Sequence, residues 1–164
     1  MERVQATNKL RYHEQLLNQP AVHAPDLTRT AAAKSSGPAV WRTDFPGAMK
    51  QAQSENKMVL LEFTGSDWCP TCIQFNRNVL TSEKFAAYAN PRFELVKLDF
   101  PRHTPQNPEL ARANHALADQ FLIKGYPTLI VIDASGKELW RQLDDSIPNA
   151  PEAFIAELES IHRK

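Results

Sequence analysis

The segment Gly65–Cys72 (GSDWCPTC) directly follows a nearly continuous apolar run, Met58–Thr64, and contains both cysteines of the chain. A run of this length and composition is typical of a strand buried on both faces of a sheet. Gly65, Ser66 and Asp67 interrupt that strand at its carboxyl end, where α/β folds place their functional sites. The sequence therefore favours an α/β fold whose cysteine pair lies at one edge of a buried sheet.

The rest of residues 40–164 alternates between helical and strand patterns. Helices are predicted over residues 45–56, 73–80, 82–89, 109–121 and 151–163, with the second and third read as one long or broken helix. Strands are predicted over residues 58–64, 93–100, 128–133 and 138–143, and Ala134–Lys137 forms the turn of a hairpin. In the helix over residues 109–121 the apolar face is expected to carry Leu110, Ala113, Leu117 and Phe121. This order, αβαβαββα, predicts helices that flank a central mixed β-sheet.

Residues 1–39 differ from the rest in composition, because they are rich in Pro, Ala, Ser and Thr. One weak helix is predicted over residues 8–19, and little apolar surface follows it. Such a segment cannot offset its ordering entropy. We predict a flexible N-terminal arm or tether over residues 1–39 and a folded domain over residues 40–164, with a docking or oligomerisation arm as the alternative.

The charge balance excludes one class of partner. Nineteen Lys and Arg residues match nineteen Asp and Glu residues, so composition offers no electrostatic reason to bind nucleic acid or an anionic membrane. No apolar run approaches the roughly 20 residues that span a bilayer. No signal peptide follows Met1, which is consistent with a cytoplasmic protein or with an exported one whose signal was removed. We expect a monomer.

The cysteine pair allows three interpretations. A structural zinc site usually takes four Cys or His ligands, whereas this chain has two cysteines and five scattered histidines, so no metal is expected. A purely structural disulfide between Cys69 and Cys72 would close a very short loop and remove little chain entropy. The interpretation we favour is a redox-active dithiol.

Pro70 explains why the two sulfurs should differ. Proline suits the first position of a helix, where its missing N–H costs nothing, and this makes Cys69 the N-cap. Its sulfur would then lie near the free N–H groups of Thr71 and Cys72 and at the positive end of the helix dipole. Both effects favour the thiolate, and CxxC thiols in this setting have pKa values of roughly 3.5–7. Cys69 is therefore predicted to be the nucleophile, and the shielded Cys72 the resolving thiol.

A second element lies far away in the sequence. Pro127, in the segment Gly-Tyr-Pro-Thr, stands at the start of the strand over residues 128–133, a position that ordinarily needs an N–H donor. A cis X–Pro bond would satisfy that geometry, and a trans proline that merely ends the loop is the alternative. Tyr126 is expected to present its backbone to an extended peptide, which would add as a short strand.

These features together resemble the thioredoxin fold. A strand, Trp-Cys-x-x-Cys opening a helix, and a distant Gly-Tyr-Pro-Thr before a hairpin are shared with it. The fuller segments Phe63–Cys69 (FTGSDWC) and Leu95–Arg102 (LVKLDFPR) are similar to the bacterial, exported Dsb-type thiol:disulfide oxidoreductases. The resemblance covers residues 41–164, although the first strand of a thioredoxin is poorly marked, at most over residues 39–41.

The resemblance implies a function. It implies a thiol:disulfide oxidoreductase, more as a reductase than an oxidase or isomerase, that needs no metal or organic cofactor. Protein or peptide disulfides would be its substrates, and a further, unidentified redox partner would recycle it. A periplasmic or otherwise exported location is implied, with a cytoplasmic one as the alternative. The predicted substrate-binding residues are Trp68, Pro70, Thr71, Tyr126 and Pro127, with Trp68 as an apolar rim over the sulfurs.

One departure from thioredoxin leaves the direction of electron flow open. Pro70-Thr71 separates the cysteines here, where thioredoxin has Gly-Pro, and this dipeptide tunes the reduction potential across the fold. Two other functions are compatible with the same fold. They are a redox-inactive peptide-binding or assembly module, and a thiol peroxidase, which is disfavoured because Glu62 stands where its motif requires proline.

Glu62 is the candidate for proton transfer. Thioredoxins keep a buried aspartate on this strand, and the extra residue in Gly65–Asp67 would bring Glu62 into register with it. A buried carboxylate has a raised pKa and can exchange a proton with the resolving thiol. The alternative is a solvated, edge-facing glutamate. Asp67, Arg102 and His103, in loops, and His115, on a helix, are expected to be solvated.

Overall fold

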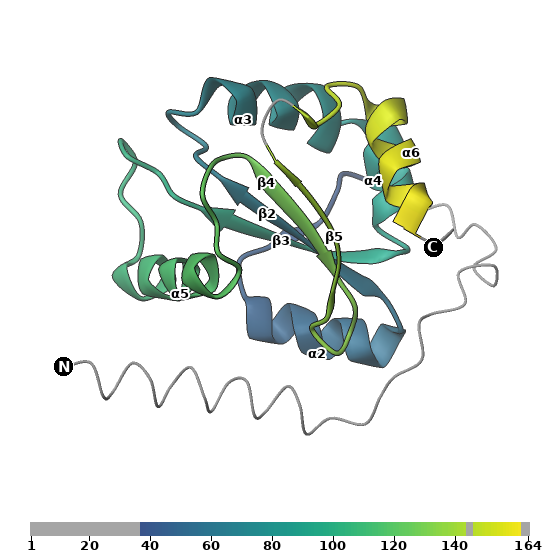
Figure 1. Ribbon diagram of the computed structural model, residues 1–164, viewed down its shortest axis with the longest axis horizontal. Helices are drawn as coiled ribbons and strands as arrows, with labels where there is room; N and C mark the ends of the chain where they lie inside the picture. The colour runs from purple at the N-terminus through teal and green to yellow at the C-terminus, as the bar shows by residue number, and fades with distance from the viewer. Residues whose placement is uncertain (1–36, 144–145, 162–164) are drawn as a thin grey trace.

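The central strands of this chain are apolar at nearly every position, so both faces of their sheet are buried. The computed structural model describes residues 37–143 and 146–161, and within them a five-stranded sheet lies between two layers of helices (Figure 1). The elements in chain order are β1 (Trp41–Arg42), α2 (Phe45–Glu55), β2 (Met58–Thr64), α3 (Pro70–Phe75), η2 (Asn76–Leu80), α4 (Glu83–Ala89), β3 (Phe93–Asp99), α5 (Pro108–Gln120), β4 (Thr128–Ile132), β5 (Glu138–Leu143) and α6 (Pro151–Ser160).

The sheet is mixed, with the strand order β1-β3-β2-β4-β5. Strands β1, β3 and β2 run parallel, whereas β4 is antiparallel to both β2 and β5. In the register Thr64 pairs with Asp99 and Phe63 with Thr128. The carboxyl ends of β2 and β3 and the start of β4 therefore lie at the same end of the sheet. The loops that follow or precede them are brought together there. The predicted thioredoxin fold is confirmed.

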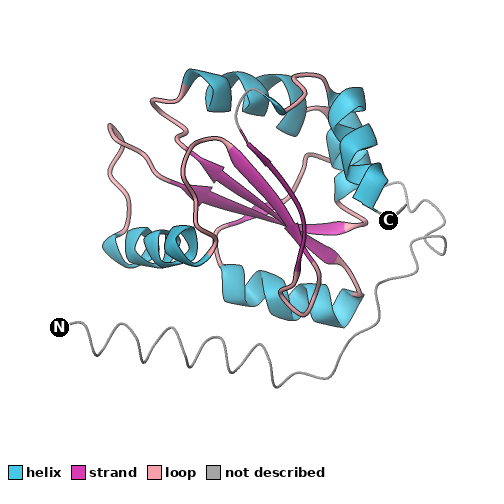
Figure 2. Cartoon of the chain, in the orientation of Figure 1, coloured by secondary structure: helices cyan, strands magenta, loops and turns pink. Residues whose placement is uncertain are grey.

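Two apolar clusters fill the space on either side of the sheet. Helices α3, α4 and α6 lie over one face and α2 and α5 over the other (Figure 2). Met58 and Leu60 of β2 pack in the first cluster with Phe75, Phe85 and Phe154. Val59, Leu61 and Phe63 pack in the second, with Phe45, Ala48 and Phe121. Because strand side chains alternate between faces, Glu62 shares the face of Leu60, below α3.

Helix α3 begins at Pro70, as its proline predicts. The helical segments differ from the prediction in two places. The chain passes through a π-helical turn, η2, between α3 and α4. In α5 the buried face includes Asn114, which donates from Nδ2 to the carbonyl of Asp99 at 3.1 Å. Ala113 is exposed, so its predicted place in that face is wrong. The buried face of α5 thus contains the polar Asn114, with a backbone hydrogen-bond partner, where the sequence predicted the apolar Ala113.

The predicted helix over residues 8–19 lies outside the described residues, as does nearly all of the predicted arm. Strand β1 is only two residues long, in keeping with its poor marking in the sequence. Every helix that the structure describes is too short or too polar to cross a lipid bilayer.

Candidate active site

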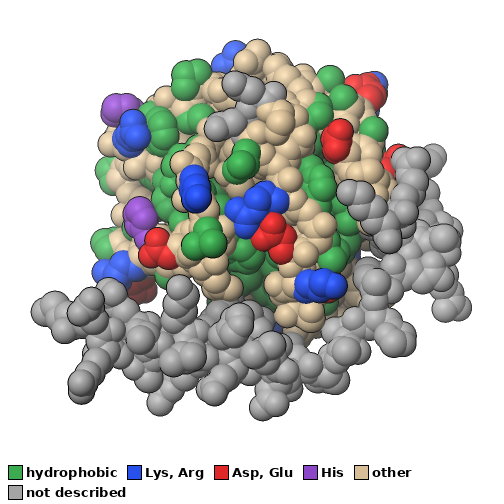
Figure 3. All heavy atoms as spheres, in the orientation of Figure 1, with side chains coloured by type: hydrophobic (Ala, Val, Ile, Leu, Met, Phe, Trp, Pro, Cys, Tyr) green, Lys and Arg blue, Asp and Glu red, His purple; other side chains and the backbone are tan. Residues whose placement is uncertain are grey.

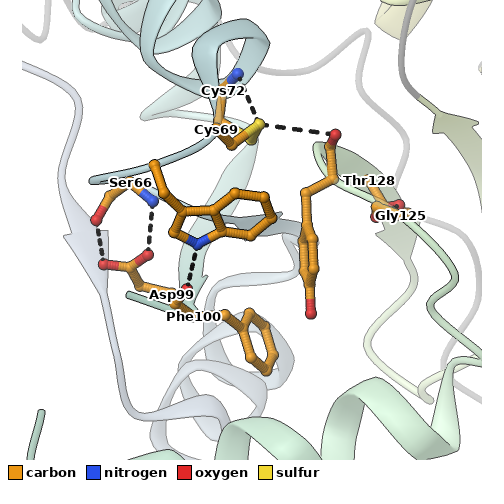
Figure 4. Close-up of a disulfide and its surroundings, with 9 residues drawn as sticks. Ser66, Cys69, Cys72, Asp99, Phe100, Gly125 and Thr128 are labelled. Atoms are coloured by element: carbon orange, nitrogen blue, oxygen red, sulfur yellow. Dashed lines mark hydrogen bonds between the residues drawn. A yellow bond between two sulfur atoms is a disulfide. The ribbon is translucent and has the colours of Figure 1, made fainter. Parts of the chain in front are cut away.

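The two cysteines form a disulfide at the start of α3 (Figure 4). Cys69 is the N-cap of the helix, and its Sγ accepts a hydrogen bond from the backbone N–H of Cys72 at 3.2 Å. Cys69 as a residue is 5% exposed and Cys72 is 1% exposed. Both residues are therefore buried in the oxidised protein, and the sulfur of Cys69 is the one that an N–H group and the helix N-terminus would stabilise as a thiolate.

The loop before β4 forms the facing wall of the site. The Tyr126–Pro127 peptide bond is cis, the isomer expected from the sequence. The carbonyl oxygen of Tyr126 lies 3.7 Å from Sγ of Cys69. Thr128 closes the loop by donating from Oγ1 to the carbonyl of Gly125 at 2.7 Å. Two segments 57 positions apart in the chain are therefore in contact at the sulfur.

Trp68 is fixed beside the disulfide by contacts on several sides. Its indole Nε1–H donates to the carbonyl of Phe100 at 2.8 Å. Its ring meets the ring of Tyr126 edge to face, with centroids 5.8 Å apart, a preferred aromatic geometry. Gly65 lies directly against the indole, so that a Cβ at this position would overlap the ring. Trp68 and Tyr126 thus form an apolar rim next to Cys69.

The loop after β3 is bound to the site by Asp67. Its carboxylate accepts the backbone N–H groups of Arg102, His103 and Thr104 at 2.9, 2.9 and 2.7 Å. These hydrogen bonds hold the pKa of Asp67 at about 2. The guanidinium of Arg102 stacks over Trp68, with Cζ 3.5 Å from the ring centroid. The expectation that Asp67 and Arg102 make only solvent contacts is therefore wrong, because partners from distant segments hold both; His115 is exposed, as predicted.

We predict that Asp67→Asn loosens this loop. An amide has one acceptor oxygen and no charge, so at least one of the three N–H groups loses its partner. Amide hydrogen exchange of residues 102–104, followed by NMR, should accelerate. Asp133→Asn is the matched control, since Asp133 accepts the N–H groups of Ser135 and Lys137 in the β4–β5 turn and should not alter exchange at residues 102–104.

The hydrogen bonds between the Asp67 carboxylate and the backbone of residues 102–104 should depend on pH in a definite direction. The folded pKa of Asp67, about 2, lies below its usual value of 3.8. A group with a depressed folded pKa stabilises the fold above its unfolded pKa and loses that contribution as the pH falls through the folded one. Protection of amides 102–104 in the wild type should therefore fall between about pH 4 and pH 2, and in Asp67→Asn this step should be absent. A wild-type step in the variant would contradict the assignment.

Glu62 is buried beneath the disulfide, as predicted. The residue is fully buried, and among the described residues neither carboxylate oxygen has a hydrogen-bond partner. Its cross-strand neighbour Lys97 places Nζ 3.7 Å from Oε2, an ion-pair distance. Burial raises the pKa of Glu62 to about 7, although the Lys97 ammonium opposes the shift. The carboxyl group can therefore gain or lose a proton near neutral pH.

A cavity of about 310 Å³ joins Glu62 to the resolving sulfur. Its walls include Glu62, Cys72 and Lys97, together with Asn76 and Arg77 of η2. This volume has room for several water molecules, so a proton could pass between Glu62 and Cys72 through solvent. No signal in the sequence indicated the cavity, because the π-helical turn that shapes it has no distinct side-chain pattern.

Comparisons with known proteins agree with this geometry. A family model described as thioredoxin-like matches residues 40–134. The disulfide bond reductase DsbH of Chlamydia pneumoniae is 34% identical over 71% of this chain and 69% of its own length. The thioredoxin-related protein DsbJ of the same organism is 28% identical over 68% of this chain, but the match covers only 32% of DsbJ. A solved structure of DsbH oxidoreductase superposes with a TM-score of 0.72 at 26% identity, covering 92% of this chain and 98% of that one.

Proposed function

This chain belongs to the thioredoxin-like family as a Dsb-type member, and from that premise we propose that it reduces disulfide bonds in proteins. Thiol:disulfide redox chemistry is the general activity of such a member, and the proposal adds the direction and the residues. The observation that carries the roles of the two cysteines is the difference between their surroundings. Cys69 caps the helix and accepts the Cys72 N–H, while Cys72 lines the cavity that also contains Glu62.

The proposed cycle begins with the reduced dithiol. The Cys69 thiolate attacks one sulfur of a substrate disulfide, forming a mixed disulfide and releasing the other substrate sulfur as a thiolate that takes a proton. Cys72 then loses its proton toward the Glu62 carboxylate and attacks Sγ of Cys69. The second substrate sulfur leaves as a thiolate, and the Cys69–Cys72 disulfide remains. Two electrons have passed from the dithiol to the substrate, and a redox partner must return them.

We propose that the substrate lies across the rim formed by Trp68 and Tyr126. Pro70 and Thr71 are exposed beside Cys69, and the Tyr126 carbonyl faces the attacking sulfur. An extended peptide could pair with the backbone before Pro127 in the manner of an added strand. The DsbH relative is called a disulfide bond reductase, which supports this direction of electron flow and a protein substrate.

The reduction potential of the Cys69–Cys72 pair tests the direction. Equilibration with glutathione redox buffers, read by mass spectrometry after thiol alkylation, should give a value near about −270 mV, as in thioredoxin, rather than about −120 mV, as in DsbA. Reduction of insulin by dithiothreitol should be faster when this protein is added. A strongly oxidising potential would reverse the assigned direction, and no acceleration would favour a redox-inactive binding module instead.

We also propose that the protein is exported, as the Dsb-type resemblance implies.

We propose further that the domain over residues 40–164 acts without the N-terminal arm. The Asn90 side chain donates to the carbonyl of Pro38 and accepts the N–H of Val40, so a truncated protein should begin at residue 37 to keep both hydrogen bonds. Deleting residues 1–36 should leave the insulin-reduction rate within about twofold and the melting temperature nearly unchanged, since this segment offers little apolar surface to bury. A large fall in melting temperature would show that it docks on the domain. Fractionation of the source cells tests export.

A further inference from the structure

The positive charge of Arg102 lies on the rim of the site. Its guanidinium stacks on Trp68, the residue immediately before the attacking Cys69. The same charge acts on Tyr126, where burial raises the pKa of the phenol and Arg102 opposes the shift. Arg102 therefore covers the ring of Trp68 and acts electrostatically on Tyr126, so a substrate bound across this rim would pass beside its charge.

Hydrogen bonds to the backbone fix the position of this arginine. The backbone N–H of Arg102 and of the next two residues are bound by Asp67. Trp68, which supports the guanidinium, is itself anchored to the Phe100 carbonyl. An arginine whose backbone and stacking surface are both fixed loses less side-chain entropy when it binds a ligand than a free one does.

The guanidinium remains available for a partner. Among the residues that the structure describes, no carboxylate lies within ion-pair distance of it. Stacking occupies one face of the planar group and leaves its N–H donors pointing outward along the edge. That fork matches a carboxylate, which it can bind through two parallel hydrogen bonds.

The charge is local rather than part of a broad basic surface. The chain has no net charge, and on the face shown in Figure 3 side chains of both signs are interspersed. A general attraction for polyanions is therefore not expected, and any preference should depend on one position of the substrate.

We propose that Arg102 and Trp68 form a carboxylate-binding subsite, which selects protein disulfides with a Glu or Asp close to the attacked cysteine. This inference rests on the proposed function, because it names the substrate class of that same site. In this proposal Arg102 contributes to substrate binding and takes no part in the thiol–disulfide exchange itself.

The test uses two synthetic peptides with one intramolecular disulfide, which differ only in a Glu or a Gln next to one cysteine. The rate of oxidation of the fully reduced protein by each peptide gives a second-order rate constant. Dithiothreitol with the same peptides supplies the intrinsic reactivity of each disulfide, by which the rates are normalised. In the wild type the normalised Glu:Gln ratio should be about three- to tenfold, the range of a favourable exposed or partly exposed charge pair.

The variants separate the subsite from general charge. Arg102→Gln should bring the ratio to about one and Arg102→Glu should invert it, whereas Lys137→Gln, an equal charge change in the turn at the opposite end of the sheet, should leave it unchanged. Raising the ionic strength from about 0.01 M to about 1 M should shrink the wild-type ratio, because the Debye length falls from about 30 Å to about 3 Å.

Three outcomes overturn the inference. A wild-type ratio near one shows that no carboxylate is selected. A ratio that survives Arg102→Gln places the selectivity elsewhere, and equal losses with both peptides show that Arg102 only supports the loop. If the wild type reacts with neither peptide faster than an unfolded dithiol control, the proposed function itself fails, which is a distinct result.

Discussion

Replacing Cys69 with serine is expected to abolish disulfide exchange, by on the order of 10³-fold or more, as removal of a covalent nucleophile does. Cys72→Ser is expected to behave differently. It retains the attacking sulfur and loses only the resolving one, so it should accumulate a mixed disulfide with its substrate. The two variants differ although the substitution is the same, because the Cys72 N–H group and the start of α3 favour a thiolate at Cys69.

Alkylation of the reduced wild type checks this assignment directly. Iodoacetamide at neutral pH should label Cys69 first, since the helix N-terminus and the Cys72 N–H favour its thiolate. Peptide mapping gives the order of labelling. Faster labelling of Cys72, or a stable mixed disulfide formed by Cys69→Ser instead of Cys72→Ser, would reverse the two roles.

Glu62→Gln is expected to slow the resolving step while leaving the fold intact. The amide has nearly the same shape, but it cannot accept the Cys72 proton. General acid–base assistance commonly contributes about 10²- to 10⁴-fold, and we expect at least a tenfold loss in the rate at which a preformed mixed disulfide resolves. Stopped-flow measurements across pH 6–9 supply this rate. Glu157→Gln, an exposed change on α6, is the control, and wild-type rates in Glu62→Gln would remove Glu62 from the mechanism.

The same variant should raise stability at neutral and higher pH. The folded pKa of Glu62, about 7, exceeds its usual value of 4.5. The stability linked to such a group is fully present below the unfolded pKa and is lost as the pH rises through the folded one. The wild type should therefore lose up to roughly 3 kcal/mol between pH 4.5 and pH 7. Glu62→Gln should lack this loss, and urea unfolding of the oxidised proteins at pH 4 and pH 8 measures the difference.

The fold was largely predictable because its signals are local. Met58–Thr64 is apolar enough to be identified as a buried strand, and all seven of its residues are buried. Pro70 identifies both the start of α3 and the capping role of Cys69. The burial of Glu62 followed from its place in that strand and from the family resemblance.

What the sequence did not reveal depends on contacts between distant segments. Nothing near Asp67 indicates that its acceptors are needed by the backbone of residues 102–104. Asn114 turns inward because the carbonyl of Asp99, at the end of β3, accepts its Nδ2–H as well as the Nε2–H of Gln106, and only the paired sheet places that carbonyl there. The cavity beside Glu62 needs the π-helical turn, a backbone feature that intrinsic propensities do not distinguish from an α-helix.

The strand order has a consequence for the newly made chain. Cys69 and Tyr126 meet because β2 pairs with β4, yet they stand 57 positions apart. The two cysteines, by contrast, are only three positions apart. They can react with each other, or with a thiol or disulfide of another molecule, as soon as both are synthesised. During the interval before β4 is made, the central strand β2 also has an unpaired edge, which is open to other chains. Reactivity thus precedes selectivity along the chain, and a nascent chain that stalled before Thr128 would exchange disulfides without discrimination.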